Sequence, residues 1–283
     1  MADRIRRSGS RAEDLQQPFK AYRVIFEQET RQAVEELKRP AHGLFISGLL
    51  AGFGMGVSVL FLAVLMTEVD DPTALSSRVF LANAYTIGFL IVIMARLDLF
   101  TEYTTIAIFP VLIGRATTLS LARLWGLVFV ANLVGGALFA AAFSVLGQPL
   151  HLAQADSLHD IAVRLVDHEW WVILLSAGVA GWLMGMLSWL VTAARETISQ
   201  AFFVWLVTFA IGFGHLHHVV LGAIEVMVAM TWGAPITLAR VLHFLSWTTL
   251  GNALGGLLFA TLIRYSLLLR GSGKDVELRE TDD

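Results

Sequence analysis

One interrupted apolar stretch constrains the fold of this 283-residue chain more than any other feature. It runs from Ile198 to Trp232 and carries three histidines near its midpoint: His215, His217 and His218. About 20 apolar residues are enough to cross a bilayer as a helix, so the stretch can span one. In hydrocarbon, polar groups persist only where they pack in protein or line a wet cavity. We therefore interpret the stretch as a broken membrane helix whose middle lines a transport path.

The composition indicates that most of the chain lies in a membrane. Apolar residues make up 56% of it and charged residues 15%, whereas soluble domains have about 45–50% and about 25%. The chain has no cysteine, which excludes disulfides and thiolate metal sites. No signal-peptide pattern is present in the polar N-terminal region, so we expect the first span to act as its own insertion signal.

Apolar segments and their breaks predict an all-α integral membrane protein with six spans. The expected spans are Gly43–Met66, Val79–Ile113, Ser120–Leu146, Trp170–Thr192, Ile198–Trp232 and His243–Leu269. The second span is broken at Arg96–Thr105, and Gly147–Glu169 is expected to be a polar loop. Three parts follow: an N-terminal region at 1–42, a transport domain at 43–269 and a tail at 270–283.

The N-terminal region is predicted to form an amphipathic helix. Apolar residues recur there at helical spacing: Leu15, Phe19, Tyr22, Phe26, Ala33 and Leu37. Such a helix is expected to lie on the membrane face or on neighbouring subunits. Most of the 20 Lys and Arg residues fall on the side of the two termini. The positive-inside rule therefore predicts cytoplasmic termini and an even number of spans.

An internal repeat divides the chain. The pattern Asn-x-x-Gly-Gly-x-Leu-Phe-Ala occurs at 132–140 and again at 252–260, and Ala-Gly-x-x-Met-Gly occurs at 51–56 and 180–185. The two broken spans hold the middle position of each set. A three-span unit that is repeated must invert its topology, and inverted repeats with paired broken helices are typical of transporters and channels.

The residues resemble the formate/nitrite transporter family over Gly43–Leu269. The matching pieces are Leu99-Phe100-Thr101, Trp189 with Ala193-Ala194-Arg195, His218, and Gly251-Asn252-x-x-Gly255-Gly256. This resemblance implies an aquaporin-like protomer with its own pore, a homopentamer, and transport of small monovalent anions. It also implies that His218 faces Thr101 in the pore and that Leu90, Phe100 and Ile211 form apolar constrictions.

Several positions depart from the family pattern and indicate a divergent branch. His217 stands where the family usually has a glutamate, Gly222 where it has an asparagine, and Arg96 where it has a small residue. Two acids, Glu102 and Glu225, lie near the breaks. The fold therefore carries over better than formate or nitrite as the substrate.

An imidazole can help an anion through an apolar pore, because it can offer a positive field or a proton near physiological pH. We expect His218 to bond with Thr101 and to act in this way; the alternative is an imidazole that only satisfies broken backbone. His215 and His217 are expected either to cap that backbone or to line the pore.

Arg96 needs a partner if it lies in the membrane. The candidates in reach are Asp98, Glu102 and Glu225. Two roles stay open for it: an ion pair that braces the breaks, or an anion filter. Glu225 follows His218 by seven residues and is expected either to tune that histidine or to pair with Arg96.

Two other functions compete with anion transport. His-x-His-His invites a metal, but the other histidines form no second cluster in the sequence, so a metalloprotein is the weaker alternative. A channel for neutral small solutes would share the same architecture. We expect no enzyme activity, no cofactor and no nucleic-acid partner, and we expect the bacterial inner membrane as the location.

Overall fold

The structure is a computed structural model that describes residues 20–269, and every regular element in that range is a helix. The all-α class is thus confirmed. The helices are α2 (Tyr22–Lys38), α3 (Ala41–Glu68), α4 (Leu75–Met94), α5 (Phe100–Ile106), α6 (Ile108–Leu112), α7 (Thr118–Leu146), α8 (Ala155–Val166), α9 (Trp170–Ala193), α10 (Thr197–Phe213), α11 (Val219–Thr231) and α12 (Leu238–Leu269). Leu15 and Phe19 of the predicted N-terminal helix, and the predicted tail at 270–283, lie outside the described residues.

Length and apolar character single out the helices that can cross a bilayer. Four of the described helices meet both conditions by themselves: α3, α4, α7 and α9. Shorter apolar helices are α10, α11 and the pair α5 and α6. The last helix, α12, has 32 residues and begins at Leu238, before the expected start at His243, because the helix continues through the residues that precede the apolar run.

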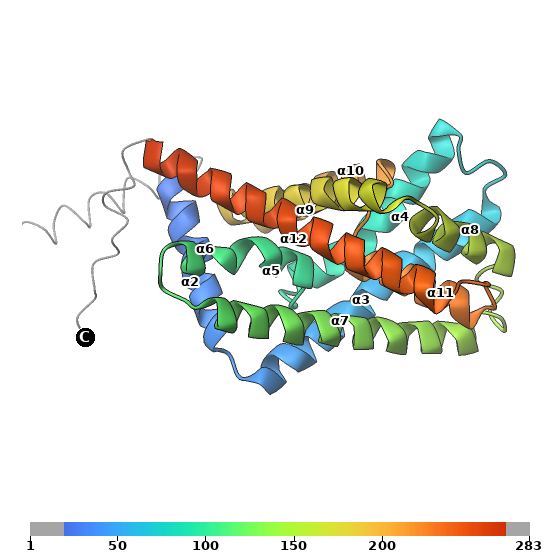
Figure 1. Ribbon diagram of the computed structural model, residues 1–283. Helices are drawn as coiled ribbons and strands as arrows, with labels where there is room; N and C mark the ends of the chain where they lie inside the picture. Colours follow the sequence, from blue (N-terminus) through green and yellow to red (C-terminus); the bar gives the residue numbers. More distant parts are fainter. Residues whose placement is uncertain (1–19, 270–283) are drawn as a thin grey trace, which may run out of the picture.

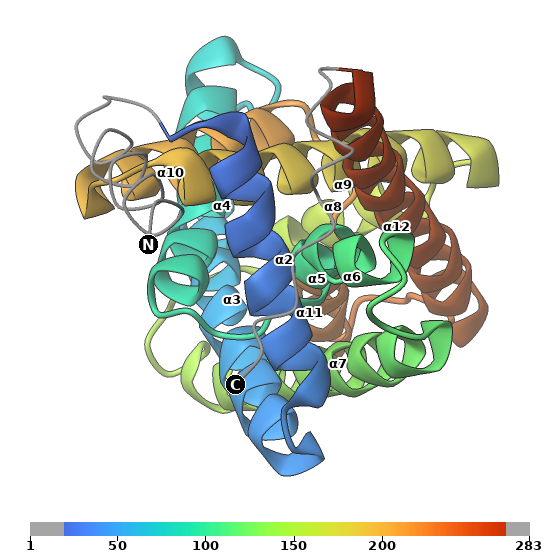
Figure 2. The same ribbon diagram turned by 90° about the vertical axis from the view of Figure 1, so that its left-hand side faces the viewer.

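The long helices pack in pairs around the short ones. Helix α12 lies along α9, α3 along α7, and α10 along α4. Figure 1 shows α5 and α11 inside this bundle, with α2 at one end of the molecule and α8 at the other. Seen from the first end, α2 crosses the bundle in front of α5 and α6 (Figure 2).

Both broken helices end in the same way. Helix α4 ends at Met94 and α10 at Phe213, and two residues beyond each end Arg96 and His215 adopt left-handed backbone conformations with φ of 55° and 50°. The N–H of the next residue, Leu97 or Leu216, donates to the carbonyl five residues earlier at 3.0 Å. A left-handed residue commonly terminates a helix, although usually it is glycine. Beyond each of these two residues the backbone is extended until the next helix begins.

An asparagine holds the first break. The Asn132 amide, on α7, donates to the carbonyls of Gly48 at 2.8 Å and Asp98 at 2.9 Å, and its oxygen accepts the Phe100 N–H at 2.9 Å. Buried backbone groups need partners, and the break has no helical partner to give them. Asn132 therefore joins α3, α7 and the extended segment between α4 and α5.

A second asparagine does the same at the other break. The Asn252 amide, on α12, donates to the carbonyls of Ala177 at 2.8 Å and His217 at 3.0 Å, and its oxygen accepts the Val219 N–H at 2.9 Å. Asn252 joins α9, α12 and the extended segment between α10 and α11. The predicted Asn-x-x-Gly-Gly segments thus make corresponding sets of contacts.

Glycines allow the close approach that these bonds require. A Cβ atom on Gly52 would stand 2.0 Å from the Asn132 carbonyl oxygen, and one on Gly181 would stand 2.1 Å from that of Asn252. No side chain fits at either position. The small residues of α3 and α9 are therefore necessary for packing against α7 and α12, as membrane helices commonly show.

Helix α2 packs on its own bundle: Phe26 lies edge-on against Phe109 at 5.0 Å, and Ser188 donates to the buried Glu29 carboxyl at 3.0 Å. Whether α2 also contacts the membrane face or neighbouring subunits stays a prediction. The expected polar loop at 147–169 is wrong, because the segment contains α8, an amphipathic helix whose apolar face, including Leu158, is buried.

Candidate functional site

Thr101 and His218 meet at the point where the two breaks come together. The Thr101 Oγ1 lies 2.7 Å from the His218 Nε2, and both residues are buried. Thr101 is in the first turn of α5, and His218 precedes the first residue of α11. Each break therefore contributes one polar side chain to a single hydrogen bond.

The other ring nitrogen of His218 caps α11. Its Nδ1 accepts the N–H of Leu221 at 3.3 Å. An N-cap of this kind satisfies a helix N–H that has no partner in the helix. Since Nδ1 accepts, the neutral imidazole carries its proton on Nε2 and donates it to Thr101 Oγ1. The Thr101 hydroxyl hydrogen is then available to a third group.

Phe89 is a site residue that the sequence reasoning missed. Its fully buried ring lies edge-on to the His218 imidazole, with centroids 4.9 Å apart. Tyr85 stacks on the other side of Phe89 at 5.4 Å. The spacing of four residues between two aromatic side chains on α4 was the available signal, because such residues share a helix face.

The three residues expected to form constrictions differ in how deeply their side chains are buried. Ile211 is fully buried, Leu90 is half-buried, and Phe100 is buried at the start of α5. The Phe100 ring packs edge-on against Trp125 and Phe129 of α7. Among the aromatic ring pairs of residues 20–269, Phe89 is the partner of the His218 ring.

A large polar cavity lies on the α2 side of the pair. Its volume is about 570 Å³. Residues from α2 line it together with Arg96, Asp98 and Glu102 of the first break. We call it the α2-side cavity. Glu102, which lines the cavity, directly follows the fully buried Thr101 in α5, so the cavity approaches the central pair from this side without including it.

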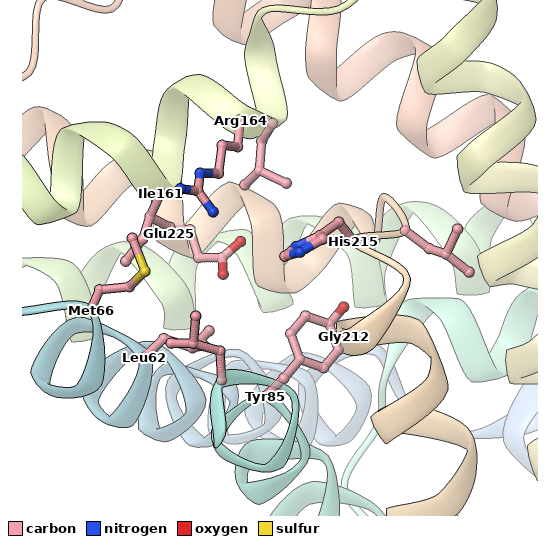
Figure 3. A pocket seen from close by; sticks show the side chains of 11 residues that line it. Leu62, Met66, Tyr85, Ile161, Arg164, Gly212, His215 and Glu225 are labelled. Atoms are coloured by element: carbon pink, nitrogen blue, oxygen red, sulfur yellow. The ribbon is translucent and has the colours of Figure 1, made fainter. Parts of the chain in front are cut away.

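A smaller cavity lies on the opposite side, beneath α8. Its volume is about 80 Å³, and we call it the α8-side cavity. Tyr85, Arg164, His215 and Glu225 contribute polar groups to its lining (Figure 3). Tyr85 also stacks on Phe89, which contacts His218, so the central pair lies between the two cavities.

The expected ion pair of Arg96 is absent from residues 20–269. Arg96 is exposed in the α2-side cavity, and no carboxylate lies within ion-pair distance of it. Asp98 pairs instead with Arg39, whose Nη1 lies 3.1 Å away, and accepts the Tyr103 hydroxyl at 2.6 Å. The cause is positional: the break turns Arg96 outward and Asp98 inward. Glu102 and Glu225 also lie on different sides of the central pair.

His217 is a structural residue. Its Nδ1 lies 2.9 Å from Ser176 Oγ and its Nε2 lies 3.2 Å from the carbonyl of Leu165, so the ring joins α8 and α9. His215, by contrast, is exposed in the α8-side cavity. In the part of the chain that the structure describes, no three His, Asp or Glu side chains are placed to hold a metal ion.

A helical bundle in which two broken helices meet between two cavities defines a membrane transport protein or channel. The family description "Formate/nitrite transporter" matches residues 23–266 of the sequence. The chain belongs to the formate/nitrite transporter family, whose members are transporters and channels and not enzymes. The resemblance predicted from the motifs is therefore confirmed.

Individual relatives cover most of the chain. The inner membrane protein YfdC of Escherichia coli (strain K12) is 30% identical over 249 residues, which cover 86% of this chain and 77% of that protein. The nitrite transporter NirC of Salmonella typhimurium is 27% identical over 228 residues, or 78% of this chain and 81% of the relative. Among solved structures, one described as an FNT family ion channel has a TM-score of 0.79 at 21% identity, covering 86% of this chain and 98% of the other.

A second solved structure is described as a pentameric formate channel with formate bound. It has a TM-score of 0.71 at 19% identity and covers 81% of this chain and 98% of that one. At these identities the two structural matches support the fold of this chain.

Proposed function

We propose that this protein forms a pore for small monovalent anions, such as formate and nitrite, or for their conjugate acids. One observation carries the proposal: the buried Thr101–His218 hydrogen bond lies between two cavities on opposite sides of the bundle. The names of the relatives, a nitrite transporter and a formate channel, agree with this substrate class.

Neutral hydrogen-bond donors suit the centre of such a pore. An anion in a narrow apolar channel loses its hydration at a high cost, which donors or a proton can offset. His218 donates through Nε2 to Thr101, whose hydroxyl can in turn donate to a passing anion. Addition of a second proton to His218 would cost the bond from Leu221 to Nδ1. In this proposal protonation of His218 is therefore tied to the start of α11.

The proposed protomer has six spans in two inverted three-helix repeats, with the second and fifth spans broken. The support lies in the paired contacts: Asn132 and Asn252 make corresponding hydrogen bonds, and Arg96 and His215 adopt the same backbone conformation. The proposed assembly is a homopentamer in the bacterial inner membrane with both termini in the cytoplasm. The pentameric formate channel, the inner membrane relative and the positions of Lys and Arg support it.

Purified protein in liposomes tests the proposed transport. Uptake is measured for formate, nitrite, acetate, lactate, chloride and hydrosulfide at two pH values, with protein-free liposomes as the background. Saturable uptake of formate or nitrite above this background is expected. A neutral-solute channel would instead show water or ammonia flux with no anion uptake under any pH gradient, and that result would remove the proposal.

A further inference from the structure

The α8-side cavity holds polar side chains that the central pair does not use. Figure 3 shows the Glu225 carboxyl, the Arg164 guanidinium, the His215 ring and the Tyr85 ring around one space. They come from α11, α8, the second break and α4. Leu62 and Met66 of α3 supply an apolar wall.

Two of these groups are deeply buried and lack a partner within residues 20–269. Glu225 is 7% exposed, and its carboxyl makes no hydrogen bond or ion pair there; Tyr85 is 8% exposed, and its hydroxyl has no partner. A buried polar group that lacks a hydrogen bond costs about 1–3 kcal/mol, and a charged one costs more. The Tyr85 hydroxyl is enclosed by protein, whereas the Glu225 carboxyl borders the cavity, which indicates that a molecule in the cavity provides the bond that Glu225 lacks.

The chemistry of the lining selects a small oxyacid. The Arg164 guanidinium and a ring N–H of His215 can donate to oxygens of an anion, whereas an ionised Glu225 would repel it. A single proton between Glu225 and the ligand removes that repulsion and forms a hydrogen bond between them. The volume of about 80 Å³ admits a molecule of a few non-hydrogen atoms.

We propose that the α8-side cavity is a binding site for a small monovalent oxyanion together with one proton, and that Glu225 holds this proton. The proposal rests on the proposed transport function and adds a second site to it. The proton reaches Glu225 from the solution on the α8 side. The O–H bond of Glu225 then breaks as an O–H bond forms on the ligand, which leaves a carboxylate near Arg164 and a neutral acid.

The position of the site allows the neutral acid to continue inward. Glu225 lies seven residues beyond His218, about 10 Å along the axis of α11. The proposed path of the acid between Glu225 and His218 runs beside Tyr85 and the fully buried Phe89, whose ring contacts His218. A neutral acid crosses such an apolar segment at a lower cost than its anion. Arg164, His215 and Tyr85 are the charged or titratable groups that face Glu225 across the cavity.

Formate uptake by variant proteins in liposomes tests this site. The variants are Glu225→Gln and Arg164→Gln, and Asp160→Asn, an exposed α8 residue that does not line the cavity, is the matched control. At about pH 7.5, Glu225→Gln should raise the KM for formate about tenfold or more, equivalent to one charge-assisted hydrogen bond. The increase in KM should be smaller at about pH 5.5, where a larger fraction of the formate in solution is already the neutral acid. Arg164→Gln should raise KM at both pH values because it removes the cationic donor, and Asp160→Asn should leave KM unchanged at both.

Two results would overturn the site. One is an unchanged KM and pH profile in Glu225→Gln while the wild-type protein transports formate. The other is a loss of ammonium uptake in Glu225→Gln with formate uptake intact, since the carboxylate would then serve a cation.

Binding in detergent separates this inference from the proposed transport. If the wild-type protein moves no anion, transport is wrong, and the site is tested by the effect of formate on thermal stability. Stabilisation of the wild-type protein that Glu225→Gln abolishes supports the site. Equal stabilisation of both proteins, or of neither, overturns it.

Discussion

Asn132 and Asn252 occupy equivalent places in the two halves of the molecule. Each amide donates to two backbone carbonyls, one on a long helix and one in a break, and each amide oxygen accepts the N–H that begins the following half-helix. Two residues 120 positions apart in the sequence thus close the two breaks that bring Thr101 to His218.

Replacement of either asparagine by leucine should destabilise the protein strongly. Leucine has a similar size but leaves two buried backbone groups of the break without partners, a carbonyl and an N–H, at about 1–3 kcal/mol for each. The midpoint of thermal unfolding in detergent measures the effect. Gln148→Leu, which removes an amide from an exposed position just beyond the end of α7, is the control and should have a small effect. An equal loss in all three variants would contradict the account of the breaks.

Alanine at Gly52 or Gly181 should prevent close packing of the long helices. The added Cβ would overlap a carbonyl oxygen of α7 or α12, and backbone cannot move away as a flexible side chain does. A cost of about 1–3 kcal/mol or more is expected, as for overpacked cores. Gly126→Ala on α7 is the matched control because nothing lies within 4 Å of its Cβ position. Unfolding midpoints and the yield of assembled protein report the difference; similar values for all three variants would contradict the prediction.

The docking of α2 should depend on pH through Glu29. Burial raises the pKa of this carboxyl to about 8, although the hydrogen bond from Ser188 opposes the shift. A raised acid pKa means that the docked helix holds a proton that the undocked helix releases above about pH 4.5. Docking should therefore weaken as the pH rises from about 4.5 to about 8 and then level off.

A single cysteine can report this docking, since the chain has none of its own. Ala33→Cys places a thiol on the buried face of α2. The ratio of its labelling rates at about pH 8.5 and about pH 6 is measured with Glu29 present and again with Glu29→Gln. The comparison of the two ratios cancels the pH dependence of the thiol itself. The ratio should be larger with Glu29 present, and Glu35→Gln should behave like the wild type. Identical ratios with and without Glu29 would rule out this role.

The two arginines near the first break should behave differently. Arg39→Gln leaves the buried Asp98 carboxylate without its ion pair and should destabilise the protein by about 1–3 kcal/mol. Arg96→Gln removes an exposed side chain and should leave stability within about 0.5 kcal/mol of the wild type. Thermal unfolding of the two variants decides the matter. A larger loss in Arg96→Gln than in Arg39→Gln would show that Arg96 is the bracing charge.

Much of the central site was predictable because it depends on local sequence. The histidines mark the second break, and the repeated Asn-x-x-Gly-Gly segments mark the helices that hold both breaks. The resemblance to the family paired His218 with Thr101, a contact between residues 117 positions apart that periodicity alone does not show.

Other features were not predictable because they depend on the tertiary structure. Arg39 reaches Asp98 across 59 residues, and the nearer Arg96 turns away because its backbone is left-handed. Phe89 is fully buried against His218 whereas the adjacent Leu90 is half-buried, since the rotation of α4 decides which neighbour points inward. Helix α8 was not recognised from the sequence, because its segment is polar apart from one narrow apolar face.

Formate flux through His218 variants tests the central claim most directly. Wild-type protein, Thr101→Val and His218→Asn are placed in liposomes that contain a pH-sensitive dye, and formate uptake and internal pH are recorded together. His218→Asn should reduce formate uptake at least about tenfold and change its pH dependence, because it loses the Nε2 donor and the titratable ring while its amide oxygen can still cap α11. Thr101→Val should reduce uptake while it leaves the pH profile of the remaining flux in place. Wild-type rates and an unchanged pH profile in folded His218→Asn would contradict the proposed role of the Thr101–His218 pair.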